Sequence, residues 1–248
     1  MRRRLLPLLG ISIAAATHHA QAAELEVMSA GAMEPGLAPA LQAFRRVSGQ
    51  AVQIRYATAP ALQQALADGA APQLVIGPDS LMAGLARADG LAGQPQPLGR
   101  VGVGMAVRPD LTIAPVTDAE GLRQLVLGAQ AVVFNRASSG LYLERLFERM
   151  QLAAIVAPKA RRYRTGAEVM SHLLHGTGRE VGFGAITEIR MVRELRYLGP
   201  LPSELQSYTT YSAALTPGAP AAAEALLRWL SGPEARAAFD AVGIEPAR

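Results

Sequence analysis

The fold is decided by residues 27–79, VMSAGAMEPGLAPALQAFRRVSGQAVQIRYATAPALQQALADGAAPQLVIGPD. Three short apolar segments, which we place at 24–30, 51–57 and 73–77, are each followed by a helical pattern of apolar residues. Strands and helices that alternate in this way predict an open α/β sheet. The carboxyl ends of the strands then lie along one edge, where the helices begin with unpaired backbone N–H groups. The sequence therefore predicts an edge at which an anion or a carboxylate can dock.

The first 22 residues have the features of a signal peptide. Three arginines at 2–4 precede an apolar run at 5–16, and Ala-Gln-Ala at 20–22 is a small-x-small cleavage site. The apolar run is too short to span a bilayer, and no later stretch offers about 18 uninterrupted apolar residues. We expect cleavage near Ala22 and export to the periplasm. The chain has no cysteine, so we expect neither a lipid anchor nor a disulfide.

The leader carries much of the positive charge. The chain has 24 basic and 20 acidic residues, and removal of the three leader arginines leaves 21 against 20, a net charge of about +1. The remaining arginines are interspersed with glutamate and aspartate, so we expect no nucleic acid partner. About 226 mature residues are enough to bury the core of one large domain or of two small lobes.

The same alternation begins again in the second half of the chain. The predicted elements are a Gly-, Pro- and Gln-rich connector at 90–99, strands at 100–108, 131–135, 180–187 and 205–215, and helices at 117–127, 141–150, 167–175, 219–230 and 233–242. We place two crossings between lobes, which gives a signal peptide at 1–22, lobe 1 at 23–99 plus 208–248, and lobe 2 at 100–207. Two α/β lobes joined in this way form a clamshell, and ligands bind between such lobes.

The order of these pieces resembles the periplasmic substrate-binding proteins of ABC importers, type II class, and most closely the molybdate/tungstate-binding family. The best local matches are FRRVSG at 44–49, DGAAPQLVIGPD at 68–79, the SSGLY turn at 138–142, EVGFGAITE at 180–188 and LRWLSGPEARAAFDAVGI at 227–244. The resemblance covers nearly all of the mature chain. It implies a monomer without a cofactor that binds a small oxyanion between its lobes and delivers it to an ABC permease in the inner membrane.

The resemblance also implies where the ligand is held. Members of that family hold a tetrahedral oxyanion through serine hydroxyls, backbone N–H groups at helix N-termini and one tyrosine hydroxyl. The two serines align on Ala32 and Ala59, and the tyrosine aligns on Ala185, so three hydroxyls are missing here. Each lost bond to a charged group costs about 1.5–3 kcal/mol. The candidate ligand contacts are Ser29, Gly31, Ala32, Met33, Thr58, Ala59, Arg136, Ser138, Ser139, Ala167 and Ala185.

These losses leave the ligand open. One alternative to a molybdate-like oxyanion is a small organic anion, such as a carboxylate, held by the same helix starts together with Arg136 or Arg164. A secreted enzyme or a sensory adaptor of the same shape is an alternative from another class. We expect no enzyme, because the sequence has no G-x-S-x-G or H-E-x-x-H motif, no Walker lysine, no cysteine nucleophile and no evident pair of catalytic acids.

A metal site is the remaining chemical possibility. His172 and His175 lie three residues apart on a predicted helix, with Glu168 four residues before the first, and this spacing can place three ligands on one face. No second cluster in the sequence supplies further ligands. We therefore expect no bound metal.

Overall fold

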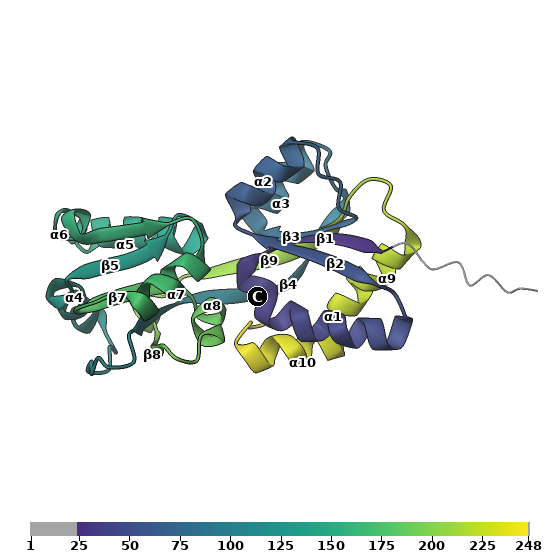
Figure 1. Cartoon of the computed structure of the whole chain (residues 1–248). Helices are drawn as coiled ribbons and strands as arrows, with labels where there is room; N and C mark the ends of the chain where they lie inside the picture. The colour runs from purple at the N-terminus through teal and green to yellow at the C-terminus, as the bar shows by residue number, and fades with distance from the viewer. Residues whose placement is uncertain (1–23, 248) are drawn as a thin grey trace, which may run out of the picture.

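Two α/β bodies lie side by side and are joined by two strands, β4 (Ala92–Val107) and β9 (Tyr208–Leu215), in a computed structural model that describes residues 24–247 (Figure 1). Strand pairing runs through both bodies in the order β2-β1-β3-β9-β4-β7-β5-β6, and β8 also pairs with β4. The predicted signal peptide lies outside the described residues. No helix in the described part of the chain is long and apolar enough to cross a membrane.

The first body, called lobe 1, contains the three predicted strand and helix units. Its parallel strands are β1 (Leu25–Ala30), β2 (Val52–Ala57) and β3 (Leu74–Pro78), and β9 pairs antiparallel with β3. Helices α2 (Ala59–Ala67) and α3 (Asp79–Arg87) cover one face, and α1 (Glu34–Ser48), α9 (Ala221–Leu230) and α10 (Pro233–Val242) cover the other (Figure 1). A short 3-10 turn, η1 (Gly31–Met33), connects β1 to α1. The three predicted parallel strands are confirmed to within one residue, and the predicted return strand begins at 208 instead of 205.

The second body, called lobe 2, has its own hydrophobic core around Phe134, Phe147 and Phe183. Its strands β5 (Ala131–Asn135), β6 (Ala160–Tyr163) and β7 (Glu180–Ala185) are parallel, whereas β4 runs antiparallel to β7 and to β8 (Arg196–Pro200). Its helices are α4 (Ala119–Gly128), α5 (Ser138–Arg149), α6 (Ala153–Val156), α7 (Gly166–His175) and α8 (Ile186–Met191), with 3-10 turns η2 (Ala157–Lys159) and η3 (Ser203–Leu205). Separate cores in the two bodies agree with the predicted two-lobed class.

The structure corrects two predicted elements and adds two strands. The connector predicted at 90–99 is largely part of β4, because its backbone pairs with β9. The register of this pairing shifts between Ala92 and Gln96 and again between Pro97 and Gly99. Prolines in this segment have no backbone N–H to donate, which is typical of such irregular pairing. The strand predicted at 180–187 ends at Ala185, and helix α8 follows at once. Strands β6, at 160–163, and β8, at 196–200, were not predicted.

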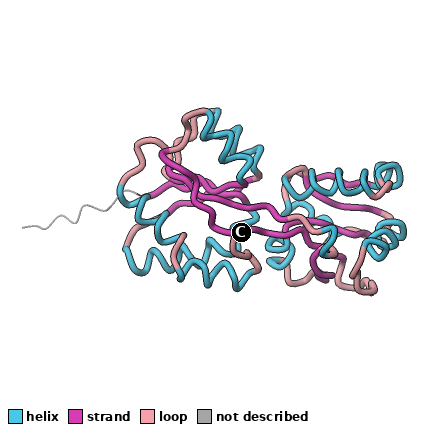
Figure 2. The backbone as a smooth tube through the Cα atoms, turned by 180° about the vertical axis from the view of Figure 1, so that it is seen from behind, coloured by secondary structure: helices cyan, strands magenta, loops and turns pink. Residues whose placement is uncertain are grey.

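The two crossing strands lie next to each other over their central residues. Arg100, Val101 and Gly102 of β4 pair with Thr210, Thr209 and Tyr208 of β9. Figure 2, seen from behind, shows both strands continuing from one body into the other. The predicted lobe borders, at 99/100 and 207/208, fall inside β4 and directly before the first residue of β9, and they stay a prediction.

Candidate functional site

A cleft of about 260 Å³ lies between the lobes. Its walls come from the first residues of helices in both lobes: Gly31 and Ala32 before α1, Thr58 and Ala59 at α2, Ser138 and Ser139 at α5, Thr165 and Ala167 at α7, and Ala185 and Glu188 at α8. The crossing strands also line it, through Val101, Gly102 and Val103 of β4 and Thr209 and Tyr211 of β9. The predicted meeting of helix starts is therefore present in the fold.

Most of the candidate contact residues line this cleft, but three of them do not. Gly31, Ala32, Thr58, Ala59, Ser138, Ser139, Ala167 and Ala185 are lining residues. Ser29 is fully buried behind the cleft and its hydroxyl donates to the Ala30 carbonyl at 3.2 Å. Met33 is buried in the core of lobe 1, and Arg136 is exposed outside the cleft. The structure thus gathers the small residues and places the predicted cation elsewhere.

Two of the helix starts keep their backbone N–H groups free of side-chain caps. Neither Thr58 before α2 nor Ala137 before α5 caps its helix with a side chain. At α5 the turn is held by Asn135, whose Oδ1 accepts from the Ala137 N–H at 3.0 Å and from the Ser139 hydroxyl at 3.3 Å. A side chain on Gly140 would overlap the Asn135 carbonyl, so the close turn requires glycine there. These orphan donors and the helix dipoles favour an anionic group in the cleft.

Two carboxyl groups, Glu34 and Glu188, also line the cleft. Burial raises the pKa of Glu188 to about 7, against the lowering effect of a hydrogen bond from the Ala185 backbone N–H, and nearby Glu34 raises it further. Burial likewise raises the pKa of Glu34. Neither residue was expected from the sequence. The available signal was the spacing of Glu188, three residues after Ala185, which is the N3 position from which a glutamate caps a helix start.

Two tyrosines line the cleft although the family tyrosine position is Ala185. Tyr211 of β9 is hydrogen bonded to Thr209, whereas the buried hydroxyl of Tyr56 on β2 has no hydrogen-bond partner among residues 24–247. Burial raises the pKa of both phenols, so both remain protonated at neutral pH. An unpartnered buried hydroxyl is costly, and a ligand that accepts from Tyr56 removes that cost.

The lining contains no arginine, lysine or histidine from the described stretch of chain. The Arg164 side chain is 86% exposed and pairs with Glu168 at 3.1 Å, so it lies outside the cleft, as Arg136 does. Glu168 also accepts from the Arg164 backbone N–H, and this bond is the first cause of its lowered pKa. The positive potential of the cleft therefore comes from backbone N–H groups.

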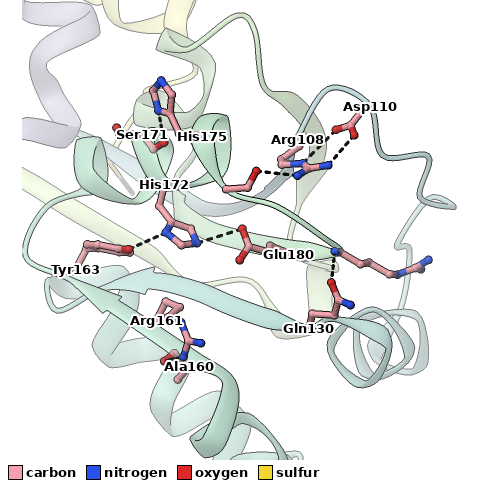
Figure 3. Close-up of polar contacts among 12 residues, drawn as sticks. Arg108, Asp110, Gln130, Ala160, Arg161, Tyr163, Ser171, His172, His175 and Glu180 are labelled. Atoms are coloured by element: carbon pink, nitrogen blue, oxygen red, sulfur yellow. Dashed lines mark hydrogen bonds and ion pairs between the residues drawn. The ribbon is translucent and has the colours of Figure 1, made fainter.

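His172 and His175, the two histidines on α7, each contact different partners (Figure 3). His172 lies between the Tyr163 hydroxyl, 2.7 Å from its Nδ1, and the Glu180 carboxylate, 3.1 Å from its Nε2. The Nδ1 of His175 is 2.8 Å from the Ser171 carbonyl oxygen. Within residues 24–247, no three His, Cys, Asp or Glu side chains are grouped to hold a metal ion.

One buried hydrogen bond joins the lobes beside the cleft. The Thr187 hydroxyl of α8 donates to the Ala32 carbonyl of η1 at 2.7 Å. Thr187 is thus committed to an interlobe contact and does not line the cleft, although its position next to Glu188 ties the start of α8 to lobe 1.

The two lobes, the paired crossing strands and the cleft of helix starts define a type II periplasmic binding protein. In fold the chain is similar to the periplasmic molybdate-binding protein of Azotobacter vinelandii, with a TM-score of 0.77 and 17% identity over 90% of this chain and 100% of that one. The substrate-binding domain of a putative molybdenum ABC transporter from Clostridium difficile gives a TM-score of 0.69 and 17% identity, over 91% and 99% of the two chains.

The chain belongs to the bacterial extracellular solute-binding protein family, whose model matches residues 25–245. The family resemblance drawn from the sequence motifs is confirmed by this match and by the fold. A relative named aconitate isomerase, from a Pseudomonas species, is 32% identical over 152 residues. Those residues are 60% of this chain and 57% of the relative, so the match spans little more than half of that protein.

Proposed function

We propose that this protein is a periplasmic solute-binding protein that takes a small organic carboxylate between its lobes and delivers it to an ABC permease. The observation that carries the proposal is the pair of carboxyl groups, Glu34 and Glu188, in a cleft whose lining has no cationic side chain from residues 24–247. A compact tetrahedral dianion places its whole charge next to these groups, with only backbone donors and a few hydroxyls to offset the repulsion, whereas a carboxylate ligand spreads its charges along a carbon skeleton. The hydroxyls expected at Ala32, Ala59 and Ala185 are absent.

A carboxylate fits the same cleft better. Its charged end accepts from the helix starts and from the free Tyr56 hydroxyl, and its carbon skeleton lies against apolar lining residues such as Val101 and Met170. Glu188, with a pKa of about 7, is present in both its protonated and its ionised form near neutral pH, and the protonated form can donate a hydrogen bond to a bound anion.

Thermal unfolding of the mature, ligand-stripped protein with a panel of anions tests the proposal. The panel contains molybdate, tungstate, sulfate, phosphate, and mono-, di- and tricarboxylates. A ligand at a thousand times its dissociation constant adds about 4 kcal/mol, which is a rise of about 8–16 °C for a protein of this size. We expect such a rise with a carboxylate. A rise with molybdate or tungstate alone contradicts the proposal and restores the oxyanion as ligand.

We infer a second candidate function, the shift of a double bond within a bound unsaturated carboxylate. The observation that supports this isomerase function is Glu188, because a buried carboxyl group with a pKa near neutrality can both accept and return a proton. The relative named aconitate isomerase supports this candidate as well. Incubation of the protein with trans-aconitate, followed by proton NMR, tests it: formation of the cis isomer above the spontaneous rate is expected. Stoichiometric binding without any product contradicts the isomerase function and supports the binding function only.

A further inference from the structure

We propose that Glu188 is the catalytic acid and base of the cleft, moving one proton between the two ends of an allylic carboxylate. This inference rests on the second candidate function. The supporting observation is the geometry around the carboxyl group of Glu188.

The Glu188 carboxyl group sits at the junction of the lobes. Gly31 of lobe 1 lies against one of its oxygens, since a side chain there would come within 3.4 Å of Oε1. Gly166 of lobe 2 lies closer still, because a β-carbon there would overlap the carboxylate. The hydrogen bond from the Ala185 N–H fixes the side chain at the start of α8. The missing side chain of Gly166 thus makes room for the carboxyl group, and the Ala185 N–H anchors that group at the wall of the cleft.

The other titratable groups that line the cleft are worse bases than Glu188. Tyr211 on β9 and Tyr56 on β2 have pKa values raised by burial and stay protonated. Glu34 on α1 is the remaining carboxyl group, and its charge acts on Glu188 from lobe 1. Glu188 has the greater upward shift of the two, which places its pKa near the pH of the reaction, where base and conjugate acid are both populated.

The step is balanced without a cofactor. The Glu188 carboxylate takes a proton from the CH₂ carbon next to the double bond of an unsaturated di- or tricarboxylate. The electron pair of that C–H bond delocalises over the three allylic carbons and onto the adjacent carboxylate. Backbone N–H groups at the α2 and α5 starts, with the Tyr56 hydroxyl, stabilise this charge. The same Glu188 then gives its proton to the far allylic carbon, and the double bond has moved by one position with no net oxidation.

The test compares wild type with Glu188→Gln in D₂O, with trans-aconitate as the probe and proton NMR as the readout. Wild type is expected to form the cis isomer and to exchange allylic hydrogen for deuterium. Glu188→Gln is expected to lose about 10²- to 10⁴-fold in kcat, the typical contribution of a general base. Its dissociation constant for trans-aconitate, measured by calorimetry, should stay within about tenfold of wild type, which shows that the variant is folded. Glu194→Gln, the same change at an exposed position of lobe 2, is the matched control and should keep full activity.

The outcomes separate the inference from the function on which it rests. Turnover by wild type together with equal turnover by Glu188→Gln overturns the role of Glu188 and leaves the isomerase function standing. Absence of turnover and of deuterium exchange in wild type overturns both the catalytic role of Glu188 and the isomerase function. Binding of trans-aconitate without turnover still supports the binding function. A wild-type measurement is decisive if the variant fails to fold. The kcat/KM of wild type should rise with pH and reach half its limit near pH 7, and a profile that is flat from about pH 5.5 to 8.5 overturns the inference.

Discussion

Replacement of Glu188 by glutamine should make the protein more stable at alkaline pH. Folding raises the pKa of this carboxyl group from 4.5 to about 7. The folded state therefore binds more protons than the unfolded state between these two pH values, and the free energy of unfolding of wild type falls as the pH rises through this window. Below pH 4.5 the group is neutral in both states and costs nothing.

The size of the effect follows from the shift. About 2.5 pKa units at 1.36 kcal/mol each give about 3 kcal/mol of lost stability above pH 7. Glutamine has no charge to desolvate and keeps an oxygen that can accept from the Ala185 N–H. Glu188→Gln should thus gain up to about 3 kcal/mol at pH 8 and almost nothing at pH 4.5. Glu34, whose pKa is also raised by burial, should leave a smaller slope of the same sign in the variant.

Urea unfolding at several pH values measures this difference. Trp229 fluorescence and circular dichroism should be followed together, since coincident transitions are the condition for a single free energy of unfolding. Glu194→Gln, at an exposed position, is the control and should run parallel to wild type. If Glu188→Gln also runs parallel to wild type between pH 4.5 and 8, the carboxyl group is not buried as described and the reasoning is refuted.

Three further predictions concern the neighbours of this group. Gly166→Ala should abolish the Glu188-dependent slope of stability with pH, because the added β-carbon displaces the carboxylate; Gly84→Ala, at an open helical position, is its control in urea titrations. Glu34→Gln should move the kcat/KM profile, or the pH profile of carboxylate affinity, to lower pH, since a like charge that raises the Glu188 pKa is gone; an unmoved profile contradicts that coupling. Thr187→Val should cost about 1 kcal/mol through the lost bond to Ala32 and favour open forms of the cleft, seen as a larger radius by X-ray scattering without ligand.

The sequence predicted the parts of this fold that depend on local patterns. Short apolar segments followed by small residues and helical spacing gave β1, β2, β3 and the helix starts that line the cleft. The 92–99 segment was missed as strand because its Gly and Pro content is typical of a loop, and its pairing partner, β9, is far away in sequence. Strand pairing between distant segments has no local signature, so propensity alone misreads it.

The sequence predicted which helix starts line the candidate site, but not which ionisable side chains lie in it. Thr58, Ser138 and Ala167 line the cleft because helix starts follow strand ends in this topology. Glu188 was not predicted as a site residue because the pattern at 180–187 predicts one continuous strand. Such a strand would place Glu188 in the following loop and not at the start of α8, where it lines the cleft. Arg136 and Arg164 were chosen for charge, but the direction of an exposed side chain is set by its partners, such as Glu168 for Arg164.

The paired crossing strands restrict how the lobes can move. A single connecting strand permits twisting as well as bending, whereas β4 and β9, bonded to each other through Val101 and Thr209, resist twist and leave one principal axis of rotation. A closing motion about this axis would bring the same helix starts back to the same relative positions. A protein that recognises its ligand mainly through fixed backbone donors depends on this reproducibility, because those donors cannot change rotamer to follow the ligand.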